Sequence, residues 1–249
     1  MSDLSNRDTL VVGASRGLGR GIARAFAEAG APVVAVARNG AALAALAADD
    51  ARIRTEAADA ADAASAGSLL DRHEPSIVVL VAGASPLMRP LHQQTWETFS
   101  VNWHTDVRIA FHWLREALLR PLRPGAMVVV VSSGAALAGS PLSGGYAGAK
   151  ATQRLITGYA RDEAERAGLG ITFTVVLPRL TPLTDLGEPA VRAYAARSGQ
   201  SVDDYLRQLG QPLAPETAGT ALVNLARADA TTVAPGYLLT AAGLTELQR

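Results

Sequence analysis

The chain has 249 residues, and its 23 basic and 23 acidic side chains leave no net charge. It therefore has no overall field that would recruit nucleic acid or an anionic membrane, and we expect neither as a partner. The chain has no cysteine, which excludes disulfides and thiolate metal sites and fits a reducing compartment. No bound metal is expected.

The first ten residues are polar and lack the pattern of a signal peptide. No apolar run approaches the ~20 residues that are needed to span a bilayer. We therefore expect a cytoplasmic protein. Since no linker or change in composition marks a boundary, residues 1–249 are interpreted as a single domain.

Short apolar runs rich in β-branched residues are distributed along the chain. They cover residues 10–12, 33–36, 77–81, 127–131 and 171–177, with weaker strands expected at 53–56 and 237–240. Such continuously apolar runs are typical of strands that are buried on both faces. Helix-compatible stretches lie between them, at 17–29, 41–48, 96–119 and 146–167. The alternation predicts an α/β fold of the Rossmann type, a doubly wound parallel sheet with helices on both faces.

The segment 179–214 interrupts this alternation. It contains two short helical pieces, 188–197 and 202–209, and it follows a strand end, where ligands bind in such folds. We interpret it as a lid over a substrate, with a plain surface insertion as the alternative.

The first predicted strand leads into a glycine-rich turn, Gly13-Ala14-Ser15-Arg16-Gly17-Leu18-Gly19. Glycines permit a tight turn and a close backbone approach, and the N-terminus of the next helix presents free N–H groups to a pyrophosphate. Glycines also serve ordinary turns. Here, however, the turn lies between a strand and a helix, which is the context that a dinucleotide site requires.

The residues after the second strand bear on the choice of cofactor. An acidic side chain there would favour NAD, but the sequence has Ala37 followed by Arg38. Arg38 and Arg16 suit the 2′-phosphate of NADP, because guanidinium groups match phosphate oxygens. The alternative is that both arginines are solvated surface residues. Asp59, after the third strand, is placed to contact the adenine, although alone it would be an ordinary loop aspartate.

A second group of residues follows the strand at 127–131. Tyr146 comes 13 residues after Ser133, and Lys150 lies four residues further on, on the same face of a helix. Tyrosine ionises in water only near pH ~10, and a neighbouring ammonium favours the phenolate. Lys150 is the one lysine among the 23 basic residues. A GC-rich genome would explain the 22 arginines, but not why this position has an amine.

With these motifs the chain resembles the classical branch of the short-chain dehydrogenase/reductase family, from about residue 9 to 243. The resemblance implies that Asn102 positions a water in a proton relay and that Ser133 orients the substrate. It implies that Tyr146 is the general acid/base and that Lys150 binds the nicotinamide ribose and tunes the tyrosine. The cofactor would contact Gly13, Ser15, Arg16, Gly17, Leu18, Gly19, Arg38, Asp59, Ala60, Ala82, Gly83, Tyr146, Lys150, Pro178 and Thr181.

The sequence departs from the family pattern in three places. The usual Asn-Asn-Ala-Gly is here Leu80-Val81-Ala82-Gly83, so the asparagine that braces the central sheet is missing. The usual Pro-Gly after the sixth strand is Pro178-Arg179, which places a side chain where the backbone normally runs close to the nicotinamide.

The third departure concerns the threonine that often holds the carboxamide of the cofactor. Its position is occupied by Leu183, with Thr181 and Thr184 close by. These differences affect the seating of the nicotinamide and leave the four catalytic side chains in place.

Together these residues predict an NADP-dependent oxidoreductase that transfers hydride between NADPH and a carbonyl or alcohol. Two alternatives stay open: a non-redox reaction on the same fold, and an NADP-binding sensor without catalysis. Family members commonly form tetramers through helices at 96–119 and 146–167, so a homo-oligomer, a tetramer or a dimer, is expected. The segments 84–94, 135–145 and 179–209 would form the substrate pocket, and their composition indicates no single substrate class.

Overall fold

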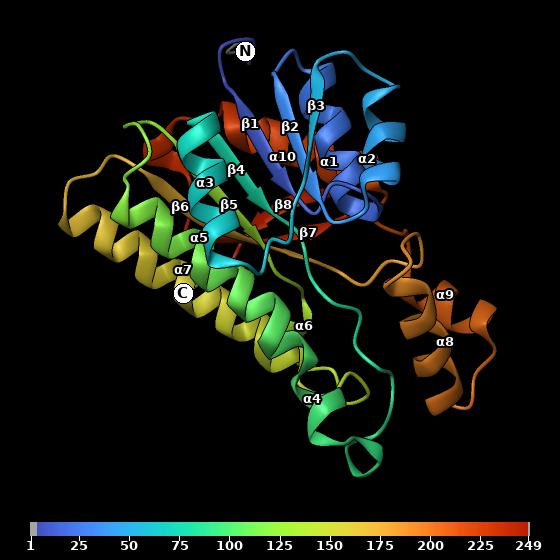
Figure 1. The fold of residues 1–249 in the computed structure, drawn as a ribbon. Coiled ribbons are helices and arrows are strands. Elements are labelled where there is room, and N and C mark those ends of the chain that lie inside the picture. The colour runs from blue at the N-terminus through green and yellow to red at the C-terminus, as the bar shows by residue number, and fades with distance from the viewer. Residues whose placement is uncertain (1–3, 249) are drawn as a thin grey trace.

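In the computed structural model, which describes residues 4–248, one sheet is covered by helices on both faces (Figure 1). The strand order is β3-β2-β1-β4-β5-β6-β7-β8, and every neighbouring pair is parallel except β7 and β8. The strands are β1 (Thr9–Val12), β2 (Val33–Ala37), β3 (Ile53–Ala57), β4 (Ile77–Leu80), β5 (Met127–Val131), β6 (Thr172–Pro178), β7 (Gly236–Thr240) and β8 (Gly243–Glu246). The predicted doubly wound parallel sheet is confirmed.

Helices connect successive strands and pack on the two faces of the sheet. The α-helices are α1 (Gly17–Glu28), α2 (Gly40–Ala47), α3 (Ala63–His73), α4 (Trp96–Asn102), α5 (Arg108–Leu119), α6 (Ala135–Ala138), α7 (Tyr146–Arg166), α8 (Gly187–Arg197), α9 (Val202–Leu209) and α10 (Pro215–Arg227). Helices α1, α2 and α10 cover one face, and α3, α5 and α7 cover the other (Figure 1). No helix within residues 4–248 is both long enough and apolar enough to cross a bilayer.

The core consists of two hydrophobic clusters, one on each face of the sheet. Alternate residues of each strand contribute to opposite clusters: in β1, Val11 packs toward α1 and α10, whereas Leu10 and Val12 pack toward α3 and α5. The central strands are therefore buried on both sides, which explains why their sequences are apolar without alternation.

Four elements differ from the sequence-based expectation. The final strand β8 is antiparallel and pairs with β7 through Leu238 and Thr245, and its half-polar sequence has no run of apolar residues. Helices α3 and α10 were not among the stretches singled out in the sequence. The predicted helix at 96–119 contains a π-helical turn, η2 (Trp103–Val107), between α4 and α5.

Candidate active site

The carboxyl ends of β1, β2, β4, β5 and β6 open into a cleft of about 880 Å³. Parallel strands bring their carboxyl ends to one edge of the sheet, where loops of distant sequence meet. Every residue that the sequence predicted to contact the cofactor lines this cleft, and so does Ser133. Asn102 does not line it; its side chain is fully buried behind the wall.

The glycine turn brings β1, β4 and α1 together at one end of the cleft. Gly13 has a φ of +99°, and a Cβ at this position would lie 2.5 Å from the backbone nitrogen of Ala82. A Cβ on Gly19 would lie 2.1 Å from the carbonyl oxygen of Gly13. Only glycine permits these approaches. Helix α1 begins at Gly17 without a side-chain cap, so its first N–H groups are available to an anion.

Two arginines line the cleft beside this helix. The side chains of Arg16 and Arg38 are both exposed to solvent. Arg16 forms an ion pair with Asp185, whose carboxylate lies 3.0 Å from the guanidinium. Arg38 forms no ion pair or side-chain hydrogen bond with any residue of the described chain. Asp59 also lines the cleft, and its carboxylate accepts a hydrogen bond of 3.0 Å from the backbone N–H of Ala61.

The opposite end of the cleft contains the tyrosine and the lysine of α7. Lys150 Nζ lies 5.5 Å from the centroid of the Tyr146 ring, as their i, i+4 spacing predicts. Both side chains are buried, although both still contribute to the cleft wall. Ser133 follows β5 on the same wall. Its neighbour Ser132 donates a hydrogen bond of 2.8 Å to the Lys150 carbonyl, which fixes α7 against the end of β5.

Lys150 has two polar partners besides the tyrosine. Its Nζ lies 3.0 Å from Asp106 Oδ2 and donates a hydrogen bond of 3.1 Å to Gln153 Oε1. Burial by itself would lower the pKa of the Lys150 ammonium, but the negative charge of Asp106, the Tyr146 phenol and the contact with Asp106 outweigh it, and the pKa is raised above its ordinary value. The lysine is thus held in its charged form next to the tyrosine.

Asn102 ends α4, directly before the π-helical turn. Its Nδ2 donates a hydrogen bond of 2.8 Å to the Ala84 carbonyl and one of 3.3 Å to Asp106 Oδ1. The asparagine therefore reaches Lys150 through Asp106, and the water-holding role implied by the family resemblance stays a prediction.

The departures from the family pattern have different structural settings. Leu80 is buried in the core, where apolar packing replaces the bracing asparagine. Arg179 is exposed and lines the cleft, and its side chain has no hydrogen-bond or ion-pair partner within residues 4–248.

Two threonines lie near the position where the family often has a threonine for the carboxamide, which is Leu183 here. Thr181 is buried and donates a hydrogen bond of 2.8 Å to the Leu213 carbonyl. Thr184 lies close to Gly17, whereas Leu183 is half exposed.

Helices α8 and α9 form an arm that projects from the body of the molecule beside the cleft (Figure 1). The hydroxyl groups of Ser140 and Tyr194 lie 2.6 Å apart and connect this arm to the loop after α6. Tyr194 of α8 stacks on Tyr205 of α9, with ring centroids 6.5 Å apart. Both tyrosines line the cleft, so the two sequence-predicted helices contribute an aromatic wall to it.

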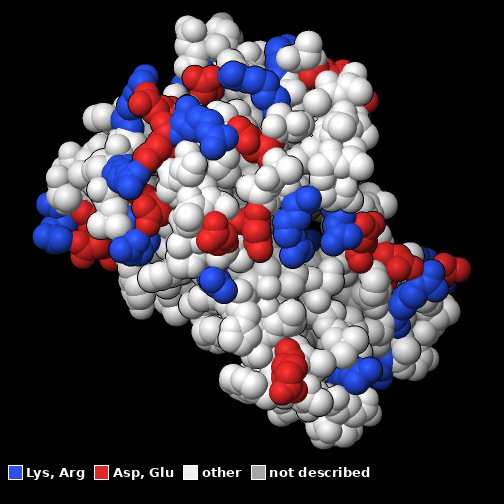
Figure 2. Space-filling model, in the orientation of Figure 1, with Lys and Arg blue, Asp and Glu red and all other residues white. Residues whose placement is uncertain are grey.

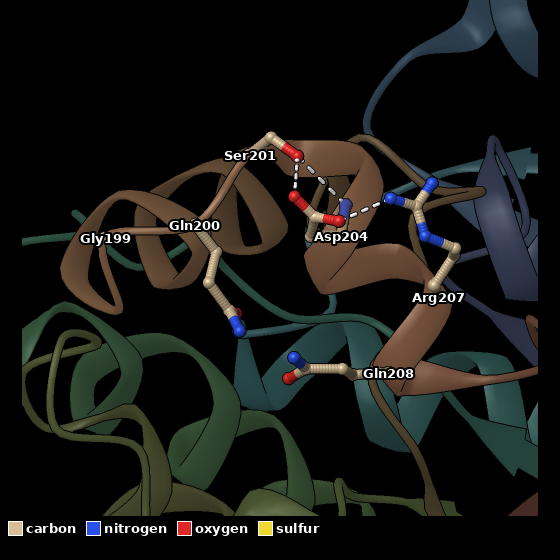
Figure 3. Close-up of a pocket in the computed structure, with 6 residues that line it drawn as sticks. All are labelled: Gly199, Gln200, Ser201, Asp204, Arg207 and Gln208. Carbon is tan, nitrogen blue, oxygen red and sulfur yellow. Dashed lines mark hydrogen bonds and ion pairs between the residues drawn. The ribbon is translucent and has the colours of Figure 1, made fainter.

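A second, shallow hollow lies at the tip of this arm, between α8 and α9 (Figure 3). The side chains of Gln200 and Gln208 point toward the same open space, and Ser201 caps α9 by accepting a hydrogen bond from the Asp204 backbone. The carboxylate of Asp204 is paired with Arg207. Because its charged groups neutralise one another, this hollow offers no site comparable to the cleft.

Charged side chains of both signs are mixed over the visible surface; the region over α6 is largely uncharged, whereas an acidic patch lies over α4 (Figure 2). Apolar side chains are also exposed on the neighbouring helices: Trp103 on η2, Phe111 on α5, and Leu155 and Tyr159 on α7. They lie on the helices through which the sequence predicted assembly.

A family model described as short chain dehydrogenase matches residues 7–195. The chain belongs to the short-chain dehydrogenase family. Members of this family are oxidoreductases that act on small molecules with a nicotinamide cofactor. The chain is also similar to L-xylulose reductase from Mesocricetus auratus, with 30% identity over 132 residues, which is 52% of this chain and 54% of that relative. The match thus spans about half the length of the relative.

The cleft of this short-chain dehydrogenase fits a nicotinamide dinucleotide. At one end lie the free N–H groups of α1 and two arginines, which suit phosphate groups. At the other end, Asp106 Oδ2 is buried and receives no hydrogen bond within residues 4–248, although Lys150 faces it. The residues that line the cleft thus present cationic donors to the phosphates and the ammonium of Lys150 to ribose hydroxyls.

Sequence reasoning missed two residues of this short-chain dehydrogenase site, Asp106 and Gln153, and it placed Tyr194 only within the pocket segment 179–209. Asp106 follows Asn102 by four positions and Gln153 follows Lys150 by three, so each shares a helix face with a residue that was singled out. A polar side chain on the buried face of a helix was the available signal. The hydrogen bond between Tyr194 and Ser140 could not be predicted from a local pattern, because the two residues lie 54 positions apart.

Proposed function

We propose that the protein is an NADP-dependent oxidoreductase that reduces a carbonyl or oxidises the corresponding alcohol. The observation that carries this proposal is the position of buried Lys150 beside Tyr146, in one cleft with Ser133 and the glycine turn of β1 and α1. A surface tyrosine–lysine pair would need none of this burial. The relative that is named as an L-xylulose reductase supports the reductive direction.

In this proposal the side chains supply the proton and the binding of the carbonyl oxygen. When bound, NADPH supplies hydride to the carbonyl carbon. Ser133 and Tyr146 donate hydrogen bonds to the carbonyl oxygen as negative charge develops on it. Tyr146 then gives its proton to that oxygen as a general acid. Lys150 stabilises the phenolate that is left, and Asn102 belongs to the network behind the lysine through which the proton is replaced.

The preference for NADP rests on the residues at the ribose end of the cleft. Arg16 and Arg38 offer guanidinium groups there, and Ala37 takes the place of the acidic residue that would favour NAD. Arg38 has no competing partner within residues 4–248. Its guanidinium is therefore available to a 2′-phosphate without breaking an existing contact.

The segment 179–214 would serve as a lid within the single domain 1–249. Tyr194, Tyr205 and Leu209 line the cleft from this segment, and the Ser140–Tyr194 hydrogen bond connects it to the opposite wall. These side chains favour a substrate with apolar or aromatic surface next to its carbonyl.

Transfer of a labelled hydride tests the proposed reaction. The protein would be incubated with a panel of ketones and aldehydes and NADPH deuterated at the reactive carbon on one face or the other. We expect deuterium in the alcohol product from one of the two isotopomers only. Tyr146→Phe should abolish turnover while leaving NADPH binding intact. Tight NADPH binding with no deuterium in any product would contradict the proposal and favour a non-redox or sensor role.

A further inference from the structure

Asp106 is a carboxylate that is fully buried in the wall of the proposed active site. It lies in the π-helical turn Trp103–Val107, and its side chain has 0% exposure although it lines the cleft. A buried charge is costly unless it is paired and hydrogen-bonded. π-helical turns within α-helices are frequently found at functional sites. An aspartate in this position therefore requires partners that compensate its charge.

Both carboxylate oxygens of Asp106 have such partners. Oδ1 accepts a hydrogen bond of 2.8 Å from the backbone N–H of Ala84 and one of 3.3 Å from Asn102 Nδ2. Oδ2 lies 3.0 Å from Lys150 Nζ. The carboxylate thus lies between the asparagine and the lysine of the catalytic set. It connects η2 to α7 and to the loop after β4.

Gln153 closes the network on the other side of the lysine. Its Oε1 accepts a hydrogen bond of 3.1 Å from Lys150 Nζ, and its Nε2 donates one of 2.8 Å to the backbone carbonyl of Asp106. The residue is buried and neutral. Lys150 Nζ thus donates one hydrogen bond to Gln153 and forms an ion pair of 3.0 Å with Asp106, which leaves donor capacity for the side facing Tyr146 and the cleft.

Gly83, in the loop after β4, has no side chain and therefore leaves room for the carboxylate of Asp106. A Cβ on Gly83 would lie 2.8 Å from Asp106 Oδ2 and 3.0 Å from its Cγ. The close approach shows that the loop after β4 is packed directly against the carboxylate, so Asp106 has little freedom to turn away from Lys150.

We propose that Asp106 is a positioning residue of this site, which links Asn102 to Lys150 and holds the lysine protonated and directed at Tyr146. The proposal rests on the oxidoreductase function proposed above, but the charge state of the lysine can be tested without any turnover.

The effect of the Asp106 charge on proton loss from Tyr146 and Lys150 depends on the other charged and titratable groups of the cleft. Asp106 of η2 lies 3.0 Å from Lys150 Nζ. Arg179, in the loop after β6, and Tyr194 of α8 line the same cleft as the Tyr146–Lys150 pair. Asp106 is the nearest anion. Removal of its charge makes the loss of a proton from the Tyr146–Lys150 pair easier, whichever of the two groups gives the proton up.

The single lysine of the chain permits a direct test. Protein that is isotopically labelled at lysine has one side-chain ammonium signal, so nuclear magnetic resonance can follow the titration of Lys150 alone. In the folded wild type we expect Lys150 to stay protonated beyond pH ~10.4, the ordinary value for lysine. In the folded D106N variant we expect deprotonation at a pH lower by about one unit or more, because burial then acts without a counter-charge.

Gln153→Met is the matched control, since it removes two hydrogen bonds from the same network without changing any charge. It should leave the pH of lysine titration close to that of the wild type. If D106N does not fold, the test is the pH at which Lys150 titrates in folded wild type compared with urea-unfolded wild type. A lysine that titrates at the same pH or lower in the folded chain, or equally in folded wild type and D106N, would overturn the proposal.

A kinetic measurement adds a second readout once a substrate is known. We expect the basic limb of the profile of kcat/KM against pH for carbonyl reduction to move to lower pH in D106N. Gln153→Met should lower kcat/KM but leave the pH at the midpoint of the basic limb unchanged. If D106N lowers the activity without shifting the midpoint of the basic limb, Asp106 serves only to pack the site. Absence of turnover in the wild type would contradict the proposed function and leave the lysine titration as the test of Asp106.

Discussion

Arg16 and Asp185 form an ion pair of 3.0 Å that joins the glycine turn to the segment after β6. Both side chains line the cleft, and both are about two-thirds exposed, at 65% and 68%. A pair of this exposure contributes about 1 kcal/mol or less. A 2′-phosphate can therefore compete with Asp185 for the guanidinium, which would couple the arm formed by α8 and α9 to the cofactor.

Asp185→Asn should release Arg16 and tighten the binding of NADPH by up to about fivefold, the equivalent of about 1 kcal/mol. NADH affinity should stay unchanged, because NADH has no 2′-phosphate. Dissociation constants for both cofactors measure this. Asp203→Asn, an equal change of charge on exposed α9, is the control. Equal gains for NADPH and NADH would mean that Arg16 does not contact the phosphate.

Arg38→Asp should weaken NADPH binding by about 10- to 100-fold, because it removes a charge-assisted hydrogen bond and adds like-charge repulsion. NADH binding should change little. Arg54→Asp, on exposed β3 outside the cleft, makes the same change of charge and should leave both affinities near the wild-type values. If the wild type binds NADH as tightly as NADPH, the interpretation of the arginines is wrong.

Lys150→Arg should lower kcat/KM by about a hundredfold or more, although it conserves the charge. The side chain is buried against Asp106 and Gln153, and a wider, planar guanidinium cannot occupy the place of the compact ammonium without moving it. Arg166→Lys, at the exposed end of the same helix, is the matched swap and should be silent. Retention of most activity by Lys150→Arg would make the lone lysine an accident of codon usage.

Arg179→Gly restores the residue that the family usually has after β6. Because the Arg179 side chain lines the cleft without a partner in the described chain, we expect a raised KM for the substrate and a lower kcat if the contact strengthens in the transition state. Weaker NADPH binding with an unchanged KM would assign the arginine to the phosphates. Arg123→Gly, in an exposed loop earlier in the chain, is the control. Wild-type kinetics for Arg179→Gly would mean that the side chain only faces solvent.

The exposed apolar side chains of α5 and α7 predict a homo-oligomer, a tetramer or a dimer. Phe111 is 52% exposed and Leu155 is 56% exposed, and burial of both against another copy would be favourable. Phe111→Glu and Leu155→Glu should each shift the protein toward monomer in sedimentation at micromolar concentration. Leu91→Glu, at a still more exposed apolar residue outside these helices, should not. A monomeric wild type would contradict the prediction.

The strands were predictable because their signal is local. A strand that is buried on both faces must be apolar at nearly every position, and β5, with the sequence Met-Val-Val-Val-Val, shows this directly. The turn at Gly13 and the Tyr146–Lys150 pair are local in the same sense: each needs only a few neighbouring residues on one known element. Helices α3 and α10 carry weaker local signals, in the capping Asp62 and in Pro215 at the first turn.

Contacts between segments that are distant in the sequence could not be predicted from such local patterns. The family resemblance implied that Asn102 positions a water in the proton relay; the fold places Asp106 between Asn102 and Lys150, 44 positions before the lysine in the chain. The same holds for Arg16, for which sequence reasoning weighed a cofactor phosphate against plain solvent and which pairs with Asp185, 169 positions away.

What the sequence by itself determined is the fold class, the position of the glycine turn and the helix face that carries Tyr146 and Lys150, since periodicity and spacing act over a few residues. What only the tertiary structure decided is the environment of those groups. The charge of Lys150 depends on Asp106, and the cleft wall depends on Tyr194 and Ser140. Electrostatic and hydrogen-bond interactions depend on distance in space, and that distance is set by the packing of the whole sheet.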